Sequence, residues 1–195
     1  MNLSRKVDTM SLFDYIASSR QLPTGEFGSK RKRVEGSGSK MTVFQNEEHP
    51  YIPLDTFLDP KLQIHEEDIE VYDSMADIAS IGISDLHDGL LEQIRHHFTL
   101  PHVYQLYSNW GGLSFDPAFK KSFPNEYQAN VKCFKELIKL MRDHREAGDT
   151  FEIYSCWIGE EHEPKKEALS QIIELDTADN LQSFELKDKR YILFQ

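Results

Sequence analysis

The sequence predicts an α+β domain with a mainly antiparallel sheet, one long amphipathic helix at about 126–146 and two or three shorter helices. Two observations support this fold class. Short runs of β-branched and aromatic residues alternate with turn signals from residue 41 onward. The longest helical pattern is then followed by three strand-like runs in succession, which is typical of antiparallel α+β folds and not of repeating β–α–β units.

The chain has 195 residues, and single domains usually have about 100 to 200 residues. We therefore expect a flexible N-terminus at 1–10 and a single α+β domain at 11–195. Residues 25–40 combine four glycines, three serines and a Lys-Arg-Lys-Arg run, which predicts a flexible basic loop at 28–40. Before this loop, residues 11–20 predict a short amphipathic helix with Ser11 as its N-cap and the apolar residues Leu12, Phe13, Tyr15 and Ile16.

Four apolar runs after the loop predict strands at 41–45, 69–73, 80–84 and 102–108. A second helix is expected at 87–98, because Leu90, Leu91, Ile94 and Phe98 recur at helical spacing before Pro101.

The long helix is predicted by a buried stripe at a spacing of three and four residues, formed by Val131, Phe134, Leu137, Ile138 and Met141. Asn125 and Gln128 predict a capping box at its start, and Gly148 is expected to stop it. Residues 151–159 are apolar on both faces, which indicates a central strand. A further strand is predicted at 170–176, and 183–195 predicts a hairpin with its tip at 187–189.

The charge of the chain favours some partners over others. The formal net charge is −11, and residues 1–40 carry a net +4, which leaves −15 for residues 41–195. A negative field repels nucleic acids and anionic lipids and attracts basic proteins. We therefore expect a basic protein partner, no nucleic acid and no membrane. The chain also shows no long apolar run and no secretory signal, and Cys133 and Cys156 lie in core-like segments, which together predict a cytoplasmic protein with reduced thiols.

Sequence motifs for catalysis are absent: there is no GxxxxGK[ST] loop, no GxSxG elbow, no HExxH pair and no CxxC pair. Four of the eight histidines, His87, His96, His97 and His102, match no spacing of metal ligands. We accordingly predict no catalytic residue, no metal and no cofactor.

Aromatic and acidic residues are the candidates for a binding site. A tryptophan at a turn after a strand, as in Trp110-Gly111-Gly112, is the kind of side chain that anchors a protein interface. The acidic tract around residue 160 would add charge. The predicted partner- or ligand-binding residues are Tyr107, Trp110, Tyr154, Glu160, Glu161 and His162.

Four segments spread over nearly the whole chain carry a resemblance: SLFDYIASSRQLPTGEFG, PHVYQLYSNWGGL, FEIYSCWIGEE and FELKDKRYILF. They resemble a family of small bacterial proteins of Bacillus-like organisms to which no activity can be attached. The resemblance implies a single domain that includes residues 11–28, and it transfers no functional residue.

Two functions follow as expectations. The first is a non-catalytic protein that binds a basic protein partner, as immunity proteins that neutralise basic toxins do. The alternative is a small-molecule-binding protein or a hydrolytic enzyme, with a site near Trp110 and Glu160–His162.

Overall fold

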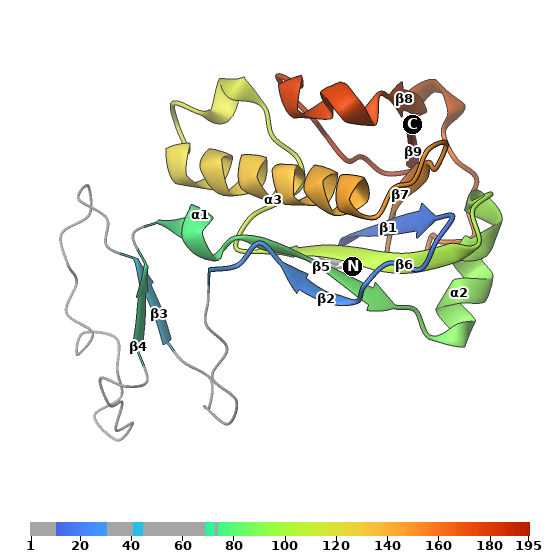
Figure 1. The fold of residues 1–195 in the computed structure, drawn as a ribbon, viewed down its shortest axis with the longest axis horizontal. Helices are drawn as coiled ribbons and strands as arrows, with labels where there is room; N and C mark the ends of the chain where they lie inside the picture. Colours follow the sequence, from blue (N-terminus) through green and yellow to red (C-terminus); the bar gives the residue numbers. More distant parts are fainter. Residues whose placement is uncertain (1–10, 31–40, 45–68, 73) are drawn as a thin grey trace, which may run out of the picture.

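The computed structural model describes residues 11–30, 41–44, 69–72 and 74–195. It is an α+β fold centred on a seven-stranded, mostly antiparallel sheet with the strand order β2-β5-β6-β1-β7-β9-β8 (Figure 1). In that order the strands are β2 (Gly25–Phe27), β5 (Ser80–Asp85), β6 (His102–Asn109), β1 (Leu12–Ser18), β7 (Phe151–Trp157), β9 (Arg190–Phe194) and β8 (Gln171–Ile173). The predicted fold class is confirmed.

Residues 12–18 form the middle strand of this sheet, and the prediction of a helix at 11–20 is wrong. β1 pairs antiparallel with β6 on one side and with β7 on the other. Ile16 packs on one face of the sheet, whereas Tyr15 and Ala17 pack on the other. A run that is apolar on both faces suits a central strand as well as a short helix, and in this chain the two neighbouring strands decide between them.

The long helix α3 (Pro124–Asp143) covers one face of the sheet (Figure 1). Its fully buried residues include Cys133, Leu137 and Met141, which join one core with residues of β1, β5, β6, β7 and β9. The predicted helix is confirmed, but the predicted caps are not. Pro124 occupies the first turn, the N-cap is Phe123 without a side-chain hydrogen bond, and the helix ends before Gly148. Proline is favoured at a first helical position because it lacks the N–H that would be unpaired there.

A smaller core lies on the opposite face, under α2 (Asp88–Ile94) and the 3-10 helix η3 (Arg95–His97). These two elements confirm the helix predicted at 87–98. Ile94 and Phe98 pack there against Tyr15, Val103 and residues of β7. The sheet is therefore covered on both faces, which explains the two-sided apolar pattern of β7.

The C-terminal segment does not form the predicted hairpin. β9 pairs antiparallel with β7 and parallel with β8. Residues 183–186 do not pair with β9, and Phe184 instead forms an isolated antiparallel bridge with Phe115. The turn at 187–189 therefore leads from this bridge into β9. The two halves of the predicted hairpin pair with different partners, since Phe184 pairs with Phe115 and β9 pairs with β7.

The remaining elements are short. They are β3 (Met41–Phe44) and β4 (Ile69–Tyr72), which form a parallel pair, α1 (Met75–Ile78), η4 (Pro117–Phe119), η5 (Glu167–Leu169) and η6 (Leu175–Asn180). The expected flexible N-terminus at 1–10 and residues 31–40 of the expected basic loop lie outside the described residues.

Candidate functional site

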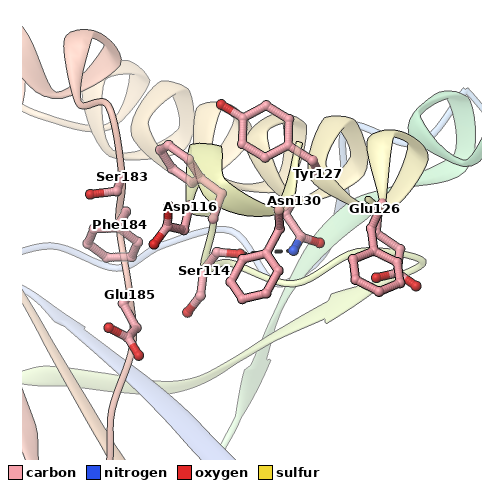
Figure 2. A pocket seen from close by; sticks show the side chains of 11 residues that line it. Ser114, Asp116, Glu126, Tyr127, Asn130, Ser183, Phe184 and Glu185 are labelled. Carbon is pink, nitrogen blue, oxygen red and sulfur yellow. Dashed lines mark hydrogen bonds between the residues drawn. The ribbon is translucent and has the colours of Figure 1, made fainter. Parts of the chain in front are cut away.

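A pocket of about 440 Å³ opens beside the first half of α3 (Figure 2). It is bounded by the loop that contains η4, by α3 and by residues 183–185 of the C-terminal segment. Its volume lies in the range of ligand pockets, about 300 to 1,000 Å³. The residues that line it are Ser114, Phe115, Asp116, Phe119, Phe123, Glu126, Tyr127, Asn130, Ser183, Phe184 and Glu185.

Local sequence features shape the loop between β6 and α3. The Asp116 carboxylate accepts a hydrogen bond from the N–H of Ala118 at 2.8 Å and so caps η4, with Pro117 in its first turn. Phe119 and Phe123 follow, and their side chains are 58% and 51% exposed. Two large aromatic rings this exposed, both on the short segment that leads into α3, are a candidate contact surface.

Hydrogen bonds hold the loop to the helix and to the C-terminal segment. The Asn130 side chain accepts from the N–H of Gly112 at 2.6 Å and donates to the carbonyl of Ser114 at 2.9 Å. The Ser114 hydroxyl accepts from the N–H of Leu186 at 2.8 Å. Phe115 and Phe184 exchange two backbone hydrogen bonds, of 2.7 and 2.9 Å. The walls of the pocket are therefore held in place before any ligand arrives, which lowers the entropy lost on binding.

The floor of the pocket belongs to the core. The ring centroid of Phe134 lies 5.2 Å from that of Phe115 and 4.5 Å from that of Phe184. Phe184 also contacts Phe194 of β9, with the centroids 6.3 Å apart. Tyr127 meets Phe115 edge-on, with an interplanar angle of 81°. This chain of rings gives the pocket an aromatic base that cannot collapse without disturbing the core.

The charge around the pocket is negative. Asp116, Glu126 and Glu185 line it, and none of its lining residues, all within the described part of the chain, is a lysine or arginine. Figure 2 shows Glu126 at one end of the pocket and Glu185 at the other. Glu185 pairs with Lys187 at 2.8 Å, and both side chains of this pair are about half exposed. An exposed pair of this kind contributes only about 0 to 1 kcal/mol, so an incoming cation can replace Lys187.

One lysine of the chain lies close to a ring that lines the pocket. The Lys120 ammonium lies 5.9 Å from the centroid of the Tyr127 ring, within the distance at which a cation is attracted to the face of an aromatic ring. Aromatic faces combined with carboxylates suit a positively charged ligand, because the rings and the carboxylates attract it together.

Two of the predicted binding residues lie on or after β6. Tyr107 is 36% exposed, on the face of the sheet opposite α3, and its ring lies over Gly82 of β5. A Cβ at position 82 would come within 2.0 Å of that ring, so Gly82 makes room for it. Trp110 is 45% exposed and has a φ of 59°, a left-handed conformation that is uncommon outside glycine. Trp110 thus sits at a tightly constrained turn after β6.

The other four predicted residues belong to β7 and the turn that follows it. Tyr154 is fully buried and stacks on His97, with ring centroids 4.0 Å apart. Glu160 pairs with Lys189 at 3.0 Å, while His162 is exposed. Glu161 is buried and accepts a hydrogen bond from the Tyr15 hydroxyl at 3.3 Å. The structure therefore brings Tyr154 and Glu161 into one cluster, and a binding role for the six residues stays a prediction.

This cluster is a buried polar network under α2 and η3. The His97 Nε2–H donates to the carbonyl of Glu161 at 2.8 Å. Burial disfavours the charged imidazolium and lowers the pKa of His97 to about 4, with His96 and Lys165 adding repulsion. His97 is thus a neutral side chain that fastens the turn after β7 to η3.

A second buried carboxylate, Glu152, lies on the same face of the sheet. It accepts hydrogen bonds from the N–H of Thr99 at 2.9 Å, from the N–H of Leu100 at 3.1 Å and from the Tyr191 hydroxyl at 2.7 Å. The Lys165 ammonium lies 3.6 Å from the centroid of the Tyr191 ring. These partners satisfy the carboxylate fully, so Glu152 fixes the loop after η3 to the sheet.

Over the described residues, no group of three His, Cys, Asp or Glu side chains is placed to hold a metal ion. Cys133 and Cys156 are both free and buried, and burial raises the pKa of each thiol. None of the helices in this described part of the chain is long and apolar enough to cross a membrane.

Sequence analysis missed most of the pocket, although a signal is present. Phe115, Phe119, Phe123 and Tyr127 recur at intervals of four residues, with Asp116 and Glu126 between them. Such spacing is that of a buried helical stripe, and Pro117 and Pro124 interrupt any such helix. An aromatic repeat broken by prolines is the feature that could have directed attention to this loop.

Comparisons with known proteins add no relative: no protein-family model, no curated protein and no solved structure matches the chain. The resemblance to the Bacillus-like family stays a prediction.

Proposed function

We propose that this protein acts by binding a basic protein partner, and that the pocket beside α3 is the centre of the contact. The observation that carries the proposal is the combination of two half-exposed rings, Phe119 and Phe123, with carboxylates at both ends of the pocket. Interfaces commonly have such a core of aromatic side chains within a polar rim.

The overall charge supports the same partner class. Residues 41–195 carry a net charge of −15, so a basic protein is attracted over the whole surface before it reaches the pocket. Electrostatic attraction raises association rates, and aromatic contacts in the pocket slow dissociation. An immunity protein that captures a basic toxin combines fast electrostatic association with slow dissociation in the same way. By analogy, we propose this biological role for the protein.

The test measures binding of a short lysine- and arginine-containing peptide by fluorescence anisotropy. We expect the wild-type protein to bind it, and Phe119→Ala to weaken binding by about tenfold, since the loss of one aromatic anchor costs about 1 to 2 kcal/mol. Asp116→Asn and Glu126→Gln should each weaken it by a few-fold.

Glu92→Gln is the matched control. It removes the same charge from an exposed position on α2, across the sheet from α3. A loss of affinity that is equal for Glu92→Gln and Glu126→Gln, together with no effect of Phe119→Ala, would show that the peptide follows net charge alone and would refute the pocket as the binding site.

A further inference from the structure

We infer that the pocket takes an arginine side chain of the partner, in preference to lysine. This inference rests on the proposed function and adds the identity of the group that enters the pocket. It is carried by the arrangement of flat aromatic side chains between carboxylates, and by the lysine that already lies over Tyr127.

The shape of a guanidinium suits this arrangement. Its five N–H donors lie in one plane, while its two faces carry no donor and are weakly hydrated. The edges of the group can therefore donate to a carboxylate while a face stacks on an aromatic ring. An ammonium has no such bare face, and it must lose a strongly held hydration shell to contact a ring.

The structure presents both surfaces that a guanidinium needs. Phe119 and Phe123 are each about half exposed, so both side chains have surface available for contact with a ligand. The carboxylates come from three separate segments: Asp116 from the loop, Glu126 from α3 and Glu185 from the C-terminal segment. Within the described residues Glu126 has no ion pair, and its carboxylate can accept a bidentate pair of hydrogen bonds.

Two other polar side chains that line the pocket already form hydrogen bonds within the protein. Both polar atoms of the Asn130 amide are bonded, to Gly112 and Ser114, and the Ser114 hydroxyl accepts from Leu186. These groups shape the pocket but offer little to a ligand. The rings and the carboxylates are therefore the groups available to bind a ligand. Both attract the charged guanidinium of arginine more strongly than a neutral polar side chain.

The test compares two peptides of equal length and equal charge. One has lysine at every cationic position, and the other has a single central lysine replaced by arginine. We expect the arginine peptide to bind about fivefold to tenfold more tightly, because stacking and bidentate hydrogen bonding are available to one side chain only. Affinities are measured by isothermal titration calorimetry with the full chain.

Phe119→Leu and Phe123→Leu test the stacking directly. Each keeps an apolar side chain at an exposed position, so folding is preserved, but removes the flat face. We expect the preference for arginine to fall to about onefold to twofold while binding of the all-lysine peptide changes little. Ile172→Ala removes an exposed apolar side chain of β8 that does not line the pocket, and it should keep the full preference.

The outcomes separate this inference from the proposed function. Equal affinity of the two peptides, with both weakened by Phe119→Ala, would overturn the arginine inference and leave the proposed function standing. Failure of both peptides to bind would overturn both. A preference for arginine that survives both Phe119→Leu and Phe123→Leu would place the arginine outside this pocket.

Discussion

At the scale of single residues, two buried titratable groups give this protein opposite responses to pH. His97 is the last residue of η3, and burial lowers its pKa from 6.5 to about 4. Asp14 is half-buried on β1 beside Ser155, whose hydroxyl donates to it at 2.6 Å, and burial raises the pKa of Asp14 from 3.8 to about 6. Each shift makes the free energy of unfolding depend on pH, and the two dependences have opposite signs.

We predict that His97→Gln removes an acid-dependent loss of stability. As the pH falls from about 6.5 to about 4, the unfolded chain binds a proton at this residue before the folded chain does. Protonation of His97 therefore lowers the free energy of unfolding of the wild type by about 3 kcal/mol. Glutamine can still donate a hydrogen bond to the Glu161 carbonyl. Urea unfolding from pH 7 to pH 4 should show the variant gaining stability relative to the wild type as the pH falls. A constant difference between the two proteins would contradict the lowered pKa.

Asp14→Asn should have the opposite effect. The folded chain binds a proton at Asp14 below pH 6 whereas the unfolded chain does so only near pH 3.8, so Asp14 destabilises the protein at pH 7. We expect the variant to be more stable than the wild type at pH 7, by about 2 kcal/mol, with the advantage disappearing near pH 4. The same unfolding series measures it, and an advantage that persists at pH 4 would argue against a titrating Asp14.

Lys120 and Lys121 allow a controlled comparison of two neighbouring lysines. Both are exposed lysines on one turn of the loop, and only Lys120 has its ammonium over the Tyr127 ring. Replacing either by alanine removes one positive charge and strengthens attraction of a basic peptide equally. We expect Lys120→Ala to increase affinity by about threefold beyond Lys121→Ala, because it also vacates the ring. Titration of the same peptide into both variants decides this, and equal affinities would show that Lys120 does not compete.

At the scale of elements, the sequence correctly predicted helices and strands that are specified by the local spacing of apolar residues. The stripe of α3, the helix at 87–98 and the two-sided pattern of β7 all appear in the structure within a few residues of their predicted bounds. Two of the errors, a helix at 11–20 and a hairpin at 183–195, concern segments whose state depends on distant partners. β1 is a strand because β6 and β7 flank it, and residues 183–186 meet Phe115 instead of β9.

The loop that carries the pocket depends on one helix residue, Asn130. Its amide satisfies the N–H of Gly112 and the carbonyl of Ser114, so Asn130→Ala leaves both without a protein partner. We expect the free energy of unfolding to fall by about 2 kcal/mol and peptide affinity to fall with it. Asn125→Ala, an exposed position in the first turn of the same helix, is the control and should change neither. Denaturation and peptide titration check both expectations, and an unchanged affinity would show that the loop does not need this anchor.

At the scale of the whole molecule, the charge on which the proposed partner class rests can be counted from the sequence, whereas the pocket is visible only in the fold. A net charge of −15 over residues 41–195 can be counted from composition. The pocket cannot, because it exists only where residues 183–185 come beside 114–116, about seventy positions earlier in the chain. Pairing across such a separation is set by the complete sheet and its two cores.

The division between long-range charge and local contact gives the last prediction. Raising the salt concentration from about 50 mM to about 300 mM shortens the Debye length from about 14 Å to about 6 Å, so association of a basic peptide should slow by about tenfold while its dissociation rate changes little. Glu126→Gln should lower the association rate, and Phe119→Ala should raise the dissociation rate, because one alters steering and the other removes a contact made after encounter. Stopped-flow measurements separate the two rates. If salt changed mainly the dissociation rate, exposed ion pairs would be holding the peptide. That result would contradict retention of the peptide by the aromatic pocket.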